Sequence, residues 1–377
     1  MIVSLDGGLP GLLEQLREVR TAGNVPLVLD PRWSAEYRDS MVSAAASAQI
    51  PEGTAWATLT SGSSGSPRIV LRTAASWRDS FAAVSEFLGG SGTESVALPA
   101  PASSSLTLFS LAHALDGGPT PHPHITPETD ALHGTPQALC AALEAGTPPR
   151  LRAALIGGSH LDPALRERAE AADIRVTAYY GAAELSFVAY DDGAHPGASP
   201  HEGPGLRAFP GVEVEIREGN ELWVRSPYVA LGYAGSAGPL RRDGAWATVG
   251  DRAEIIGGRI RLLGRADDAI LSASATIVPE EVEAVLRSIP GVRDAIVFGL
   301  PRERVGALVA TMLELEPESG ETPELARIRE LASARLATAH RPKRWFRGQI
   351  PRTASGKPAR AEVLRSVLAG EAAHLGS

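Results

Sequence analysis

The stretch from Leu151 to Gly181, LRAALIGGSHLDPALRERAEAADIRVTAYYG, is the most informative part of the chain for the fold class. Its first part is an apolar run that ends in a glycine turn at Gly157 and Gly158. A helix-like segment, DPALRERAEAA, follows with an acidic cap and a proline in its first turn, and a second strand-like run, IRVTAYYG, comes after it. Strand, helix and strand at this spacing predict a βαβ unit in a mostly parallel sheet.

Strand-like and helix-like runs alternate upstream in the same way. VPLVLD, ATLTS and RIVLRT are typical of strands, whereas the alanine-rich stretch near Met41 to Ala48 and the run SWRDSFAAVSEFL are typical of helices. The proline-rich segment from Pro119 to Pro136 predicts an irregular loop.

The pattern changes after about Gly203. VEVEIREGNELWVRS and AEIIGGRIRLLGR alternate apolar and polar residues around glycine turns, which predicts hairpins in an antiparallel or barrel-like sheet. From Asp267 onward, two helix-like and two strand-like runs predict a compact α+β unit. We therefore predict an α/β protein with two domains. Residues 1–266 form a large domain of mixed and parallel sheets with helices and the barrel-like sheet, and residues 267–377 form a small mobile α+β domain.

Composition narrows the class of protein. The chain has 377 residues, of which 44% are apolar and 21% charged, as in ordinary globular proteins. A formal net charge of −8 argues against nucleic acid as a partner, because no large cationic face is supplied. Cys140 is the only cysteine, which fits a reducing compartment. We find no signal-peptide pattern and no apolar run long enough to span a bilayer, so we expect a soluble cytoplasmic protein.

A loop rich in glycine and hydroxyl groups, TLTSGSSGSPR, runs from Thr58 to Arg68 between two apolar runs. Backbone N–H groups in such a turn can converge on anionic oxygens, hydroxyls add further donors, and Arg68 adds positive charge. The loop does not match the Walker pattern of P-loop proteins. On composition alone, a polyphosphate-binding loop and a flexible linker both remain open.

Four further motifs, together with this loop, carry a family resemblance. TSGSSGSPR, YYGAAE, VGD, GRADDAI and PRTASGKPAR occur in that order between Thr58 and Arg360. They resemble the motifs of the adenylate-forming superfamily, which contains acyl-CoA synthetases, adenylation domains of peptide synthetases and luciferases. The resemblance is nearest to bacterial acyl-CoA ligases. Compact o-succinylbenzoate–CoA ligases have a similarly short N-terminal region before the first of these motifs.

The resemblance implies an ATP-dependent reaction in which a carboxylate attacks the α-phosphorus and a thiol then displaces AMP. Lys357 would reach the α-phosphate and the carboxylate as the catalytic lysine, and Glu184 would be catalytic as the ligand of Mg²⁺. Tyr180 would lie against adenine, Asp251 would accept the ribose hydroxyls, and Arg265 would be a second nucleotide contact.

Other residues are assigned by the same resemblance. Asp267 matches the hinge between the domains. The remaining expected ATP- or AMP-binding residues are Thr60, Ser61, Gly62, Ser63, Ser64, Gly65, Arg68, Gly157, Gly158, Gly181 and Ala183.

The chain departs from the family pattern at several positions. Ala183 replaces a threonine, Arg68 replaces a lysine and Ile69 replaces a glycine. SASAT, from Ser272 to Thr276, replaces a glycine-rich turn beside the pantetheine channel, which puts the thioester step in question. The segment LPAPASSSLTLF stands where an aromatic–histidine motif is usual.

We therefore expect an AMP-forming acid–CoA ligase that uses ATP, Mg²⁺ and CoA on a fatty or other apolar acid. Three alternatives stay open: an o-succinylbenzoate–CoA ligase, an adenylation enzyme that loads the phosphopantetheine arm of a carrier protein, and a non-catalytic acyl-nucleotide binder. Arg72, Arg78 and His113 are candidate cations for a second carboxylate. A pair of histidines, His122 and His124, lacks neighbouring metal ligands. The oligomeric state stays open, with a homodimer as one option.

Overall fold

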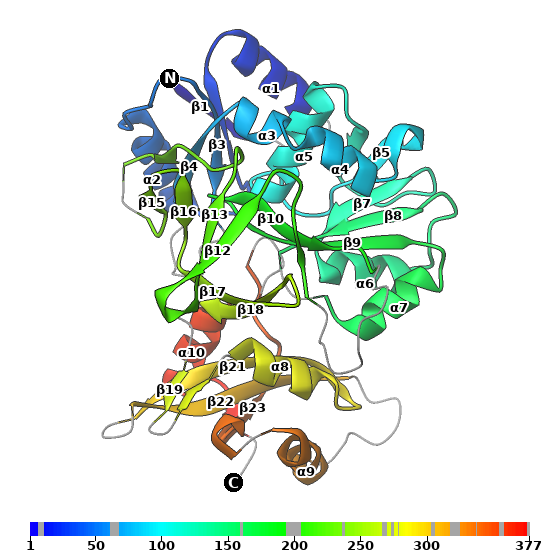
Figure 1. Cartoon of the computed structure of the whole chain (residues 1–377), viewed down its shortest axis with the longest axis vertical. Helices are drawn as coiled ribbons and strands as arrows, with labels where there is room; N and C mark the ends of the chain where they lie inside the picture. The colour runs from blue at the N-terminus through cyan, green and yellow to red at the C-terminus, as the bar shows by residue number, and fades with distance from the viewer. Residues whose placement is uncertain are drawn as a thin grey trace.

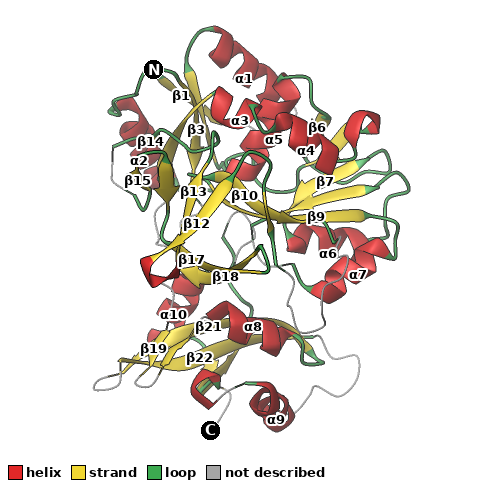
Figure 2. Ribbon diagram, in the orientation of Figure 1, coloured by secondary structure: helices red, strands yellow, loops and turns green. Residues whose placement is uncertain are grey.

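The structure is a computed structural model in which four sheets are packed with helices (Figures 1 and 2). It describes residues 1–6, 11–60, 68–158, 161–193, 205–235, 238–265, 270–272, 275–277, 279–302, 306–316, 325–336, 338–353 and 358–374.

The first sheet contains the two antiparallel strands that precede and follow the hydroxyl-rich segment in the sequence. Its strand order is β1-β2-β3-β4-β14, with β1 to β3 parallel and the last two strands antiparallel to their neighbours. The strands are β1 (Ile2–Asp6), β2 (Val25–Leu29), β3 (Thr54–Leu59), β4 (Ile69–Thr73) and β14 (Gly232–Tyr233), and the accompanying helices are α1 (Leu12–Thr21) and α2 (Ala35–Ala46).

The second sheet has seven strands in the order β11-β10-β9-β8-β7-β5-β6, and those from β9 to β6 run parallel. Its strands are β5 (Ser95–Ala97), β6 (Thr120–His122), β7 (Ala131–Gly134), β8 (Ala153–Ile156), β9 (Arg175–Ala182), β10 (Ser186–Asp191) and β11 (Arg207–Ala208). Helices α6 (Pro136–Glu144) and α7 (Pro163–Glu170) cover one face, and α4 (Phe81–Phe87) and α5 (Ser105–Leu115) cover the other (Figure 2).

The predicted βαβ unit is confirmed as β8, α7 and β9, with the two strands parallel. Asp162 caps the helix, since its Oδ1 accepts a hydrogen bond of 2.7 Å from the backbone N–H of Ala164.

Two local predictions need correction. The helix predicted over SWRDSFAAVSEFL is split into α3 (Ala75–Arg78) and α4, and the hydroxyl of Ser80 donates to the carbonyl of Trp77 at the break. The predicted irregular loop from Pro119 to Pro136 contains β6 and β7. Proline is tolerated in β6 because this strand lies at the sheet edge.

The third sheet is antiparallel, as predicted, with the order β15-β16-β13-β17-β18 and β12 beside β13. Both predicted hairpins are present, and their turns use positive φ at Gly219, Asn220, Gly257 and Gly258. The described strands do not close into a barrel. They are β12 (Glu213–Arg217), β13 (Glu221–Arg225), β15 (Arg241–Asp243), β16 (Trp246–Thr248), β17 (Asp251–Ile256) and β18 (Arg259–Arg265).

The fourth sheet forms an α+β unit with its own apolar core, below the other sheets in Figure 1. Among the described residues, its core clusters contain nothing that precedes Ile270. Its elements are β19 (Ile270–Ser272), β20 (Ala275–Ile277), α8 (Pro279–Arg287), β21 (Val292–Arg302), β22 (Gly306–Leu315), α9 (Leu325–Arg335), β23 (Arg344–Arg347), α10 (Arg360–Leu368) and β24 (Ala373–His374). The boundary at residue 266 and the mobility of this unit stay predictions.

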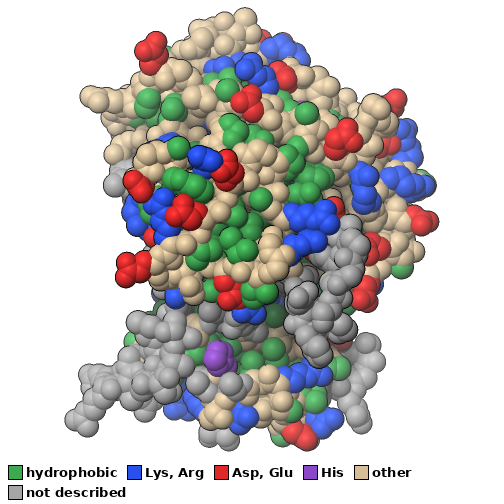
Figure 3. Space-filling view, viewed as in Figure 1, with side chains coloured by type: hydrophobic (Ala, Val, Ile, Leu, Met, Phe, Trp, Pro, Cys, Tyr) green, Lys and Arg blue, Asp and Glu red, His purple; other side chains and the backbone are tan. Residues whose placement is uncertain are grey.

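The surface carries charges of both signs. In Figure 3, basic and acidic side chains surround an area of apolar side chains over β10, β12 and β13. Among the described residues, no helix combines the length and the apolar character needed to cross a membrane.

Candidate active site

The candidate site lies at the carboxyl ends of β8 and β9, where an open parallel sheet usually binds its ligand. Gly157 and Gly158 follow β8, and the turn from Ala183 to Leu185 follows β9. β14 pairs with β4 in the first sheet, and the backbone N–H of Ala230 donates to the carbonyl of Glu184 at 2.7 Å. Segments far apart in the sequence are thereby joined around this turn.

The base of the hydroxyl-rich loop is closed by Thr60 and Arg68. The N–H of Thr60 donates to the carbonyl of Arg68 at 3.0 Å, and the N–H of Arg68 donates to the Thr60 hydroxyl at 2.9 Å. The rest of the predicted phosphate contacts lie outside the described residues: Ser61, Gly62, Ser63, Ser64 and Gly65.

Glu184 is a buried carboxylate, with only 4% of its surface exposed. Its Oε1 accepts a hydrogen bond of 2.7 Å from the hydroxyl of Tyr233, which itself accepts one of 3.1 Å from the N–H of Leu240. Burial and the Glu184 charge raise the pKa of Tyr233, whereas the positive charge of Arg68 opposes this rise. Tyr233 pairs with Val70 on β4, so Glu184 is joined to the strand that follows the hydroxyl-rich loop. Tyr233 was not predicted from the sequence.

Arg72 on β4 is fully buried and holds the turn that carries Glu184. Its Nη1 donates to the carbonyls of Ala183 at 2.6 Å and Glu184 at 3.3 Å, and its Nη2 donates to the carbonyl of Tyr228. Burial lowers its pKa to about 9, and the Glu184 charge opposes this. The guanidinium is thus engaged by backbone carbonyls, so the suggestion that it serves a second substrate carboxylate is not supported.

The other two candidate cations are also placed elsewhere. Arg78 is exposed at the end of α3. His113 is buried, stacks on Phe81 with ring centroids 4.7 Å apart, and shares a hydrogen bond of 2.9 Å with the Ser85 hydroxyl. Burial lowers the pKa of His113, which favours a neutral ring.

The structure brings Tyr180 and Asp251 together, a contact that was not predicted from the sequence. The hydroxyl of Tyr180 donates to Oδ2 of Asp251, which is 9% exposed. Asp251 begins β17 and pairs with Arg265 in the register of β18. The contacts proposed for these residues with adenine and ribose stay predictions.

Three of the predicted glycines, Gly157, Gly158 and Gly181, are placed where a side chain would not fit or would be strained. Gly158 has a φ of +89°, which favours glycine. A Cβ on Gly181 would lie 2.1 Å from the carbonyl oxygen of Ser186, across the β9–β10 turn. A Cβ on Gly157 would lie 2.2 Å from Cζ of Tyr179.

A row of three hydrogen-bonded side chains beside Gly157 was not predicted from the sequence. The hydroxyl of Tyr179 lies 3.1 Å from Nε2 of His133, and Nδ1 of His133 lies 2.6 Å from the hydroxyl of Ser110. His133 is 0% exposed. His133 belongs to the segment that was predicted to be an irregular loop. For this reason its position in the buried strand β7 was not predicted.

Lys357 and the hinge residue Asp267 lie outside the described residues. The residues around Lys357 are described on both sides. Arg352 and Pro358 form a bridge, and the N–H of Ala359 donates to the carbonyl of Pro351 at 2.8 Å. The segment carrying Lys357 is therefore closed at its base.

Arg360 anchors the end of this motif to α8 and β21. Its Nη2 lies 2.7 Å from Oε1 of Glu283 and 3.1 Å from Oε1 of Glu280, and its Nε donates to the carbonyl of Val297 at 2.8 Å. Glu283 is 5% exposed and also accepts the N–H of Val297. Arg360 is thus engaged inside the fourth-sheet unit.

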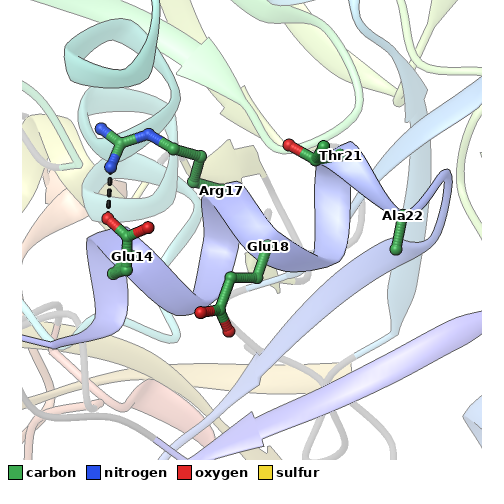
Figure 4. Close-up of a pocket in the computed structure, with 5 residues that line it drawn as sticks. All are labelled: Glu14, Arg17, Glu18, Thr21 and Ala22. Carbon is green, nitrogen blue, oxygen red and sulfur yellow. Dashed lines mark hydrogen bonds and ion pairs between the residues drawn. The ribbon is translucent and has the colours of Figure 1, made fainter.

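A shallow hollow of about 410 Å³ lies on the surface of α1 (Figure 4). Its lining residues all come from one helix and the turn that follows it: Glu14, Arg17, Glu18, Thr21 and Ala22. Glu14 and Arg17 form an exposed ion pair there. None of the predicted site residues lines this hollow.

The described residues contain no cluster of three or more histidine, cysteine or acidic side chains suited to a metal ion. A single buried carboxylate nevertheless fits Mg²⁺, which is commonly held by one or two carboxylates together with substrate phosphates. Glu184 is such a carboxylate.

These features define a nucleotide-binding protein of the open α/β class. Within that class, the chain belongs to the AMP-binding enzyme family, whose model matches residues 11–234, more than half of the chain. The model of the AMP-binding enzyme C-terminal domain matches residues 281–357. The family resemblance seen in the motifs is confirmed.

Three relatives show the range of names within the family. An uncharacterized acyl–CoA ligase of Bacillus subtilis is 27% identical over 83% of this chain and 68% of its own length. A probable 2-succinylbenzoate–CoA ligase of Mycobacterium tuberculosis is 28% identical over 86% of this chain and 87% of its own length. A fatty acid–[acyl-carrier-protein] ligase of Streptomyces coeruleorubidus is 32% identical, but over 56% of this chain and 44% of its own length.

A solved structure has the same fold. The o-succinylbenzoate CoA synthetase of Bacillus subtilis, in complex with its acyl-adenylate intermediate, superposes with a TM-score of 0.80 over 96% of this chain and 87% of its own. Sequence identity is 20%, so the likeness shows the fold alone. The predicted α/β fold with a small C-terminal sheet unit is confirmed.

Proposed function

We propose that the protein is an ATP-dependent, AMP-forming acid–CoA ligase. The observation that carries this proposal is the hydrogen bond from Tyr233 to Glu184, together with the pairing of Tyr233 with Val70, two residues after Arg68. This arrangement supports a site in which the Glu184 carboxylate would hold a metal ion near the segment that would bind phosphates. The names of the relatives support the class of AMP-forming acid–thiol ligase.

The proposed first step joins the acid to the nucleotide. A carboxylate oxygen of the acid attacks the α-phosphorus of ATP, the bond to the β-phosphate oxygen breaks, and pyrophosphate leaves. Arg68 and the loop would bind the phosphates, and Asp251 and Tyr180 would bind the nucleoside. Glu184 would help to hold Mg²⁺, which offsets phosphate charge when bound.

Lys357 would supply a positive charge to the α-phosphate and the carboxylate during this step. In the second step, a thiolate attacks the acyl carbon and AMP leaves with the electron pair of the broken bond. CoA is the proposed thiol and an apolar or fatty acid the proposed substrate, in the cytoplasm. The carrier-protein and o-succinylbenzoate alternatives correspond to the names of relatives.

Pyrophosphate release is the direct test. The protein is assayed with ATP and Mg²⁺ against fatty acids, aryl acids and o-succinylbenzoate, and active acids are then tested for thioester formation with CoA or with a phosphopantetheinylated carrier protein. Release without any thioester would support a stand-alone adenylation enzyme. Nucleotide binding without release from any acid would support a non-catalytic binder and contradict the proposal.

Lys357→Ala tests the proposed catalytic residue. Loss of one preorganised charge at a reaction centre typically lowers the rate by about 10²–10³. We expect that loss in pyrophosphate release, with ATP binding by calorimetry nearly unchanged. Full turnover by Lys357→Ala would remove this residue from the proposed mechanism.

A further inference from the structure

The ring of Tyr179 occupies the space beside the glycine turn of the site. Gly157 is buried, and a Cβ there would lie 2.2 Å from Cζ and 2.6 Å from the hydroxyl oxygen of Tyr179. No side chain fits in that space unless the ring moves. Tyr179 thus packs directly against the backbone at the carboxyl end of β8.

Hydrogen bonds to neighbouring side chains hold the Tyr179 ring in this position. Tyr179 is partly buried, and its hydroxyl meets His133, which in turn meets Ser110. Burial, reinforced by His113, lowers the pKa of His133 to about 3, so the imidazole is neutral and can donate one hydrogen bond and accept another. Displacing Tyr179 would leave a buried polar group without its partner, which is costly.

Aromatic side chains pack around Tyr179 and His133. Phe187 lies with its ring centroid 4.6 Å from that of Tyr179, and Phe109 lies 5.0 Å from Phe187 and 6.3 Å from His133. Both phenylalanines are 3% exposed. These two rings therefore occupy space between the strand ends and α5.

Neighbouring positions on β9 face opposite sides of the sheet. Tyr180 reaches Asp251 of the third sheet, whereas Tyr179 reaches His133 and the α5 side. The proposed nucleotide contacts lie on the Tyr180 side and around Glu184. We expect an acid joined to that nucleotide to lie at the carboxyl ends of β8 and β9, where open parallel sheets usually bind their ligands, and Tyr179 lies there beside Gly157.

We propose that Tyr179, held by His133, determines specificity by closing the acid-binding side of the site, so that the substrate is a compact carboxylic acid. This inference rests on the proposed ligase function. A long alkyl chain would have to enter the space that Phe187 and Phe109 occupy between the strands and α5, whereas a short or compact acid ends at the Tyr179 ring.

The test compares kcat/KM for pyrophosphate release across propionate, butyrate, benzoate, octanoate and dodecanoate. We expect the wild type to prefer the compact acids over dodecanoate by at least about tenfold, since a pocket that lacks room rejects extra methylenes by such factors. Tyr179→Ala should raise kcat/KM for octanoate and dodecanoate by about tenfold or more. His133→Phe, which keeps a ring but removes the hydrogen bond to Tyr179, should shift the profile in the same direction by a smaller factor.

Tyr37→Ala is the matched control. Tyr37 lies on α2 and packs on Trp33, with ring centroids 4.8 Å apart, in a different apolar cluster from Tyr179, so the same truncation is made away from Gly157. Its acid profile should equal that of the wild type. If Tyr179→Ala does not fold, Tyr179→Leu removes the ring and hydroxyl with a smaller loss of volume and carries the same readout.

The outcomes separate the two proposals. A wild type that prefers dodecanoate, or an acid profile unchanged in the folded Tyr179 and His133 variants, overturns the inference and leaves the ligase function standing. Absence of pyrophosphate release with every acid, in the wild type and all variants, overturns the proposed function itself.

Discussion

Tyr233 is the residue on which the placement of the Glu184 carboxylate depends most directly. Its hydroxyl donates the 2.7 Å hydrogen bond to Oε1, and a hydrogen bond to a charged group contributes about 1.5–3 kcal/mol. We expect Tyr233→Phe to lower kcat about tenfold and to raise the Mg²⁺ concentration required for half-maximal activity. Metal-free ATP binding should stay close to the wild-type value, and the midpoint of thermal unfolding should fall, because the lost hydrogen bond also stabilises the fold.

Tyr228→Phe provides the comparison for this variant. Tyr228 is also buried, and its hydroxyl donates to the carbonyl of Pro210 at 2.7 Å, so an equivalent hydrogen bond is lost away from Glu184. A Mg²⁺ requirement that rises equally in both variants would show that Tyr233 has only a structural role.

At the scale of elements, α8, β21 and α10 hold the motif that contains Lys357. Arg360 joins them through Glu283, Glu280 and the carbonyl of Val297. We expect Arg360→Ala to destabilise the fourth-sheet unit by about 2–3 kcal/mol, because the buried Glu283 loses its shortest ion pair while it keeps the N–H of Val297 and the longer pair with Arg287. Urea unfolding followed through Trp345, on β23 of the same unit, measures this loss. Pyrophosphate release should fall while ATP binding is retained.

Arg327→Ala removes another arginine of the same unit for comparison. Arg327 and Glu330 form a surface pair whose side chains are 60% and 68% exposed, and such pairs contribute about 0–1 kcal/mol. Equal destabilisation by the two variants would contradict the anchoring role of Arg360.

Elements with a strong local pattern could be predicted from the sequence, and those fixed by tertiary contacts could not. The capped helix α7 and the two glycine hairpins carry their signals within a few residues. β7 has only four residues in a proline-rich context, and its strand form depends on pairing with β5 and β8. Tyr180 and Asp251 were each singled out by a motif, although the hydrogen bond between them was not predicted, whereas the roles of Arg72 and His133 follow only from their burial and partners.

At the scale of the whole molecule, the apolar core clusters fall into two groups that share no residues. Three core clusters contain only residues up to Leu262, and two contain only residues from Ile270 onward, within the described part of the chain. We propose that these units unfold separately, since each buries its own apolar surface. Residues 1–265 alone should therefore fold cooperatively and bind ATP with nearly the affinity of the whole chain, yet release no pyrophosphate, because Lys357 is removed. Calorimetry on both chains measures the binding, and a pyrophosphate assay measures the release. An unfolded fragment would contradict separate units, and an active one would contradict the proposed part of Lys357 in the first step.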